Sequence, residues 1–128
     1  MQYMLLLTNA PDAWDRDPDD AAPDVFDDWA AYSRALASAG VLVAGHALHG
    51  PETATSVRVR AGRRLLTDGP FTETREHLLG YYLIDVPDLD TALAWAARVP
   101  NVVTGTVEVR PVVPGSDTST VLAGGGAP

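Results

Sequence analysis

Five ionisable side chains gather in a ten-residue stretch that begins with a tight turn. The turn is Asp68-Gly69-Pro70, and the ionisable residues are Asp68, Glu73, Arg75, Glu76 and His77. Asp accepts hydrogen bonds from nearby backbone N–H groups, while Gly and Pro allow and fix unusual backbone angles. Carboxylates can move a proton, and an arginine beside them can hold an anionic ligand. This stretch is therefore the first candidate for a functional site.

His46 is the best candidate for acid–base catalysis. Histidine titrates near neutral pH, and His46 follows Gly45, where a strand is expected to carry a bulge or a close backbone approach. A structural, hydrogen-bonded histidine is the alternative. Asp68 is the second catalytic candidate, as a general base or ligand acceptor; alternatively it holds its own turn by accepting the N–H of Gly69 or Phe71.

Ligand-binding roles are predicted for Phe71, Glu73, Arg75, Glu76 and Tyr81. Phe71 either walls an apolar pocket or pins the loop to the core. Glu73 and Glu76 share one face if a helical turn forms and can then flank a substrate; otherwise they belong to an exposed charged turn. Arg75 is the residue expected to hold an anion.

The spacing of these groups does not favour a metal or a common cofactor. His46, His49, Asp68 and Glu76 are conceivable metal ligands, but no HExxH or paired-ligand spacing occurs. No Gly-rich phosphate loop follows a predicted strand, and there is no GxSxG turn. We therefore expect chemistry that uses no cofactor and no metal.

Composition excludes several classes of protein. The 128 residues suit one domain, and the absence of cysteine excludes thiolate catalysis and disulfides. The net charge is −8, and residues 12–28 hold eight acids against one arginine, so nucleic-acid binding is not expected. The apolar N-terminus is too short for a signal peptide or a membrane span. We expect a cytoplasmic protein without membrane contact.

Hydrophobic periodicity predicts the strands that position these residues. The main strands are expected at residues 2–8, 41–48, 80–86 and 105–112. The first and third of them are apolar on both alternating faces, which indicates strands covered on both sides. A hairpin is predicted between residues 54 and 68, with Val57 and Val59 facing inward and Gly62-Arg63 in the turn.

Two helices complete the predicted elements. Residues 23–39 have helical spacing, with Trp29 and Tyr32 as core anchors, and Gly40 stops the helix. Asp88 caps a second helix over residues 89–99. Its expected apolar stripe consists of Leu89, Ala92, Leu93 and Ala96.

The order strand, helix, strand, hairpin, strand, helix, strand predicts an α+β fold with a ferredoxin-like antiparallel sheet. In this topology the first and third main strands lie in the middle of the sheet. Two helices cover only one face, so a second copy of the chain is the simplest cover for the other, which gives a homodimer. The domain is expected to span residues 1–113, followed by a disordered Ser, Thr, Gly and Ala tail over residues 114–128.

Several motifs in order resemble the DGPF branch of the YCII-related family. They are Asp68-Gly69-Pro70-Phe71 with Glu73, Arg75 and Glu76 behind it, Gly80-Tyr81-Tyr82, and Val107-Glu108-Val109-Arg110-Pro111. The resemblance runs from Tyr3 to Val112 and implies a ferredoxin-like fold that dimerises into an α+β barrel. The wider family's pattern implies a His–Asp pair with the His near the first helix, but residues 23–39 contain no His.

Two functions of different class are compatible with these features. The first is a cofactor-free lyase or isomerase acting on a small cyclic metabolite, with Asp68 or His46 moving a proton. The second is a non-catalytic ligand-binding or regulatory module, and the resemblance implies association with an extracytoplasmic-function sigma factor. An acid–base pair in one pocket would favour the enzyme, whereas an apolar pocket without such a pair would favour the binding protein.

Overall fold

The computed structural model describes residues 1–9, 25–69 and 76–117. The strands are β1 Gln2–Asn9, β2 Leu42–Ala47, β3 Thr55–Arg60, β4 Arg63–Asp68, β5 His77–Asp85 and β6 Thr106–Pro111. The helices are α1 Val25–Ser38 and α2 Leu89–Ala96, with short 3₁₀ turns η2 at Pro51–Thr53 and η3 at Pro100–Val103. These elements match the predicted order.

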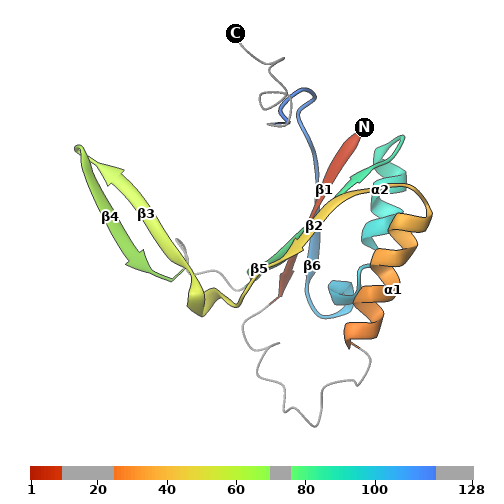
Figure 1. The fold of residues 1–128 in the computed structure, drawn as a ribbon, viewed down its shortest axis with the longest axis horizontal. Helices are drawn as coiled ribbons and strands as arrows, with labels where there is room; N and C mark the ends of the chain where they lie inside the picture. The colour runs from red at the N-terminus through yellow and green to blue at the C-terminus, as the bar shows by residue number, and fades with distance from the viewer. Residues whose placement is uncertain (10–24, 70–75, 118–128) are drawn as a thin grey trace.

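The main sheet is antiparallel with strand order β2-β5-β1-β6, so β5 and β1 lie in its centre. This confirms the predicted ferredoxin-like α+β fold. Both helices lie on one side of the sheet, and the β3–β4 hairpin projects from the other side (Figure 1). The sheet therefore has one face covered by helices and one face that the described part of the chain leaves open.

The core fills the space between the helices and the sheet. In β1 the buried side chains are Tyr3, Leu5 and Leu7, which alternate with half-buried residues on the open face. Ile84 of β5 and Leu36 of α1 are completely buried against them. Burying side chains of this size stabilises the fold by about 1.5–3 kcal/mol each relative to leaving them in water.

An aromatic cluster joins α1, α2 and β5. Tyr32 contacts the Tyr82 ring edge-on at 5.3 Å between centroids and donates its hydroxyl to the carbonyl of Trp95 at 2.9 Å. Burial, with a smaller contribution from Tyr82, raises the pKa of Tyr32 above its ordinary value. Trp29 stacks on Tyr82 at 6.5 Å. The prediction that Trp29 and Tyr32 anchor the core is therefore confirmed.

Both helix signals predicted from local chemistry are present. Gly40 has a φ of 74°, and the N–H groups of Gly40 and Val41 donate to the carbonyls of Ala37 and Leu36. This is the Schellman arrangement that ends a helix at a left-handed glycine. Asp88 accepts the N–H of Thr91 at 2.8 Å and its hydroxyl at 2.7 Å, which caps α2.

The hairpin formed by β3 and β4, here called the arm (residues 55–68), corrects one prediction. Its strands pair only with each other and form a separate two-stranded sheet. Val57 and Val59 are therefore both 59% exposed, not directed into a core. Alternation correctly indicated a two-faced strand, but it cannot tell whether either face is covered. The turn also lies one residue earlier than predicted, at Ala61 and Gly62, with φ of 51° and 76°.

Two smaller corrections concern β2 and α2. The irregularity in β2 falls between Leu42 and Ala44, two residues before Gly45, which instead gives room for the Tyr82 ring. In α2, Ala92 and Ala96 are buried as predicted, but Leu89 and Leu93 are 48% and 46% exposed. Trp95 takes their place against the core. No helix in the described ranges is long and apolar enough to cross a membrane.

Candidate functional site

Four side chains form one row across the open face of the sheet. His46 of β2 pairs with Tyr81 of β5, Tyr81 pairs with Leu6 of β1, and Leu6 pairs with Glu108 of β6. Paired residues in antiparallel strands project from the same face, so all four lie on the face opposite the helices. With about 4.8 Å between strands, the row from His46 to Glu108 is roughly 14 Å long. Histidine, phenol and carboxylate thus share one surface over an apolar floor.

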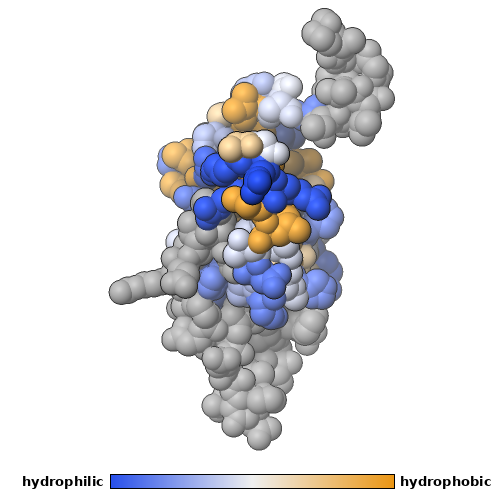
Figure 2. Space-filling model, turned by 90° about the vertical axis from the view of Figure 1, so that its left-hand side faces the viewer, coloured by the Kyte–Doolittle hydropathy of each residue, from blue (hydrophilic) through white to orange (hydrophobic). Residues whose placement is uncertain are grey.

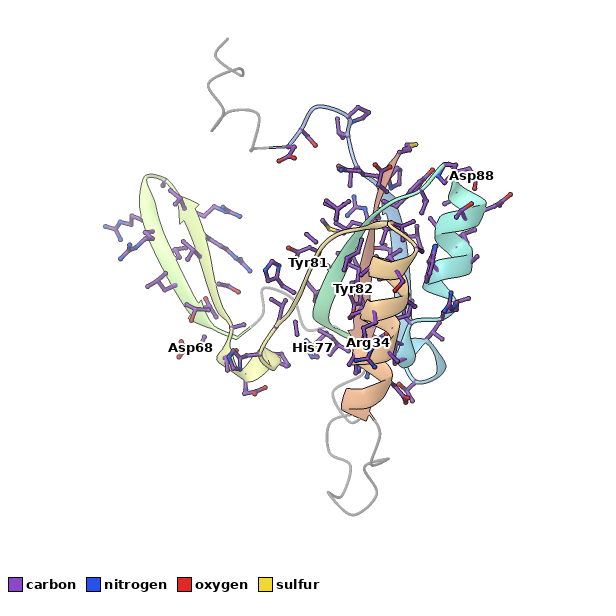
Figure 3. All side chains as sticks on the ribbon, turned by 45° about the vertical axis from the view of Figure 1, so that its right-hand side comes forward. Arg34, Asp68, His77, Tyr81, Tyr82 and Asp88 are labelled. Atoms are coloured by element: carbon purple, nitrogen blue, oxygen red, sulfur yellow. The ribbon has the colours of Figure 1, made fainter. Side chains whose placement is uncertain are left out.

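The strongest contact in this row joins His46 and Tyr81. The Nδ1 atom of His46 and the hydroxyl of Tyr81 are 2.7 Å apart, and the ring centroids are 5.6 Å apart. His46 is exposed and Tyr81 half-buried. Figure 3 shows Tyr81 on the side of the sheet toward the arm and its neighbour Tyr82 on the side of α1. Because Nδ1 contacts Tyr81, the imidazole of this exposed histidine is oriented on the sheet face.

Glu76 lies on the same face, at the end of the sheet where β5 begins. Its two carboxylate oxygens accept the hydroxyl of Thr8 at 3.0 Å and that of Thr106 at 2.9 Å. Thr8 and Thr106 are cross-strand partners in β1 and β6. The carboxylate is therefore held in place by two neighbouring strands, which is the kind of positioning a charged group needs to act on a ligand.

Asp68 lies at the root of the arm, as the last residue of β4, where it pairs with Thr55. Gly69, with φ of 96°, donates its N–H to the carbonyl of Ala54 at 2.7 Å, and its own carbonyl accepts Ser56 Oγ at 2.7 Å. The bend is thus held from β3, and Asp68 does not cap Gly69. Its side chain is exposed. Within the described residues no hydrogen bond or ion pair joins Asp68 to His46.

A hollow of about 390 Å³ lies where the arm meets the main sheet. Its lining consists of Leu48, His49, Gly50, Pro51, Thr53, Ala54, His77 and Leu78. The two imidazoles come from the segment after β2 and from the first residue of β5. The lining contains neither His46 nor Asp68, so the structure does not bring these two candidates together in this hollow.

Three predicted ligand-binding residues, Phe71, Glu73 and Arg75, lie outside the described residues, as does the tail beyond residue 117. Across the ranges that the structure does describe, no three His, Asp or Glu side chains are grouped closely enough to hold a metal ion. The candidate site therefore consists of His46, Tyr81 and Glu76 on the open face, with Asp68 and the hollow at the arm root beside it.

Comparison with known proteins identifies the family of the chain. The model of the YCII-related domain matches residues 1–116. The chain belongs to the YCII-related family. An uncharacterised protein of Rhizobium meliloti (strain 1021) is 38% identical to this YCII-related chain over 117 residues, covering 88% of this chain and 92% of the relative.

Reasoning from the sequence missed Thr8, Thr106 and Glu108 of this YCII-related protein. Nothing in the local sequence distinguishes Thr8 and Thr106, because each is a polar residue near the end of a strand. Their importance comes from register: Thr8 and Thr106 meet Glu76, and Glu108 shares the row of His46. The periodicity of β6 could have identified Glu108, since it places Val107 and Val109 on the helix side and Glu108 opposite them.

Proposed function

We propose that this YCII-related protein binds a small cyclic metabolite on its open sheet face and acts on it as a cofactor-free lyase or isomerase. The observation that carries the proposal is the 2.7 Å contact between His46 Nδ1 and the Tyr81 hydroxyl on an exposed surface. An exposed imidazole that is oriented through one ring nitrogen suits general acid–base catalysis. In this proposal Asp68 serves as a second base and Arg75 holds an anion, and the Asp68-Gly69-Pro70-Phe71 motif supports membership of the DGPF branch.

Glu76 supports this proposal because its position is fixed. The hydroxyls of Thr8 and Thr106 hold its carboxylate on the face that carries His46 and Tyr81. Beside Tyr81 on this face lies the side chain of Leu6, which is half-buried and apolar. An apolar floor with a few oriented polar groups is typical of small-molecule sites. It suits a ligand with a hydrophobic ring and one ionisable substituent.

We further propose that the protein is a cytoplasmic homodimer whose two open faces pack against each other. Met4, Leu6 and Leu83 on this face are half-buried, and the helices cover only the opposite face. Packing two such faces would remove apolar surface from water and enclose His46 and Tyr81. Light scattering at micromolar concentration tests this proposal: a dimer mass is expected, and a stable monomer would contradict it.

The alternative is a non-catalytic ligand-binding or regulatory module associated with an extracytoplasmic-function sigma factor. The hollow at the arm root favours it, because that hollow has the volume of a small ligand and is lined mainly by apolar residues and backbone. In the described part of the chain no hydrogen bond joins the two histidines of this lining, His49 and His77. A ligand bound there would be recognised without an acid–base pair.

A thermal-shift screen of small cyclic carboxylic acids separates the two functions. The proposed enzyme requires that hits lose their stabilising effect on His46→Ala and keep it on His49→Ala. Loss on His49→Ala alone would place the ligand in the hollow and favour the binding module. Each hit is then incubated with the wild-type protein and followed by proton NMR, where new product signals, weakened in His46→Ala, indicate catalysis. Ligand that stays unchanged would contradict the enzymatic proposal.

A further inference from the structure

The arm has two chemically different faces. Cross-strand pairing places Val57 with Leu66, Val59 with Arg64 and Thr55 with Asp68 on one face, which holds three of the arm's four large apolar side chains. The other face carries the pairs Arg58 with Leu65 and Arg60 with Arg63. All these residues are exposed, with Leu66 at 57% and Leu65 at 46%. Figure 2, in which the arm points toward the viewer, shows strongly hydrophilic surface directly beside hydrophobic surface.

The described residues of the same chain do not cover this apolar surface. The arm makes its strand contacts only within itself, and the bonds of Gly69 with Ala54 and Ser56 close its own root. A two-stranded hairpin alone is at best marginally stable in water. An amphipathic ribbon that projects from the body therefore indicates a surface made for another molecule.

Charge indicates what that molecule is. The arm holds four arginines, Arg58, Arg60, Arg63 and Arg64, against one acid, Asp68, which gives it a charge of +3. Because the whole chain has a net charge of −8, the remaining residues carry −11. The arm of one copy is thus complementary in charge to the body of another, and its apolar face supplies the hydrophobic contact.

We infer that the arm is exchanged between two copies of the chain. The apolar side chains Val57, Val59 and Leu66 pack on the partner copy, and the arginines pair with carboxylates of the partner. In a symmetric dimer the same contact forms twice, so each copy both gives and receives an arm. This inference rests on the homodimer proposed above and adds the element that holds it together.

Sedimentation of full-length variants tests the arm. Val57→Ser with Leu66→Ser removes the apolar contact, and Arg60→Glu with Arg63→Glu reverses charge at the tip. Each pair is expected to raise the dimer dissociation constant by about tenfold or more. Val113→Ser is the matched control, because Val113 is 69% exposed and lies outside the arm. High salt is expected to weaken the wild-type dimer, since exposed charges are screened.

A cross-linking experiment tests directly whether the arm contacts its own chain or the partner copy. The chain contains no cysteine, so a photo-reactive label on Ala61→Cys reacts only from the arm turn. In a mixture of ¹⁴N- and ¹⁵N-labelled protein, cross-linked peptides that combine both isotopes are expected. Peptides joined only within one chain would overturn the arm exchange.

The remaining outcomes distinguish the two proposals. A wild-type protein that is monomeric throughout overturns the dimer and the exchange together. A wild-type dimer that arm variants weaken no more than Val113→Ser overturns only the exchange. Binding of a labelled DNA duplex by the wild type, lost on Arg60→Glu with Arg63→Glu, would assign the arm to nucleic acid instead.

Discussion

The Tyr81 hydroxyl lies 2.7 Å from Nδ1 of His46, on the sheet face opposite the two helices. Tyr82, the next residue, points to the other face and bonds Ser33 Oγ, also at 2.7 Å. Two adjacent tyrosines thus serve different purposes, one on the candidate site and one in the packing of α1. This difference gives a matched pair of variants.

Tyr81→Phe is expected to change function without changing stability. The Tyr81–His46 bond is exposed to water, so its loss should alter the free energy of unfolding by less than about 1 kcal/mol. The imidazole would lose its orienting partner, and ligand-induced thermal shift or turnover should fall. Tyr82→Phe should do the reverse, lowering stability by about 1 kcal/mol while ligand response persists. Equal ligand response in wild type and Tyr81→Phe would remove Tyr81 from the site.

Glu76→Gln tests whether the hydrogen bonds to the Glu76 carboxylate contribute to the stability of the fold. The neutral amide has one acceptor oxygen for two donors, Thr8 and Thr106, so both hydroxyls lose a charged partner and one of them also loses its acceptor. The expected loss of stability is about 1 kcal/mol, at the lower end for bonds to charged groups because the site is partly exposed. Urea denaturation measures it. Glu108→Gln, an exposed acid on the same face, is the control and should be neutral.

Local chemistry and periodicity predicted most of the fold. Leu5 and Ile84 belong to strands with apolar residues on both faces, and these strands are central in the sheet. Asp88 and Gly40 act on their own helix ends, so their effects depend on neighbours within a few residues. Signals of this kind can be found in one sequence because both partners in the interaction are close along the chain.

The candidate site was less predictable because it depends on register between distant strands. His46 meets Tyr81 across 35 positions, and the irregularity between Leu42 and Ala44 sets which residues face each other. A shift of one residue would turn His46 to the helix side. The exposure of Val57 and Val59 was missed for a related reason, since alternation does not say what covers a strand.

Gly45→Ala is expected to destabilise the protein, although a strand is normally more stable with alanine than with glycine. A Cβ at Gly45 would lie 2.9 Å from Cδ1 of Tyr82 and 3.2 Å from the carbonyl oxygen of Tyr81. The Tyr82 ring is packed against Tyr32 and cannot move freely, so an overpacking cost of about 1–3 kcal/mol is expected. Denaturation of Gly45→Ala in the wild-type and Tyr82→Leu backgrounds measures the coupling. An equal cost in both backgrounds would show that the ring is not the cause.

Asp88→Ala should lower the melting temperature in a pH-dependent way. The bonds from the hydroxyl and the N–H of Thr91 hold the pKa of Asp88 below its ordinary value of 3.8. A group with a depressed folded-state pKa contributes stability above that ordinary value and loses it as the pH falls through the folded-state pKa. The difference in melting temperature between wild type and variant should therefore be largest near neutral pH and shrink in acid. Asp90→Ala, which removes a first-turn acid that is not the cap, should show a smaller effect. If the difference in melting temperature stays constant down to acid pH, the ionised carboxylate of Asp88 is not the source of the stability.

Asp68→Asn separates structure from function at the arm root. The bend at Gly69 is held by Ala54 and by Ser56 Oγ, so removing the charge of Asp68 should change stability by no more than about 1 kcal/mol. If Asp68 serves as a base or binds a cationic group of the ligand, the same change should abolish turnover or weaken the thermal shift while the protein stays folded. Ser56→Ala is the reciprocal variant: it removes a bond to the bend, leaves the carboxylate, and should lower stability more than it lowers ligand response. Hits that stabilise Asp68→Asn and His46→Ala as strongly as the wild type would mean that the site lies elsewhere and the turn is only a structural bend.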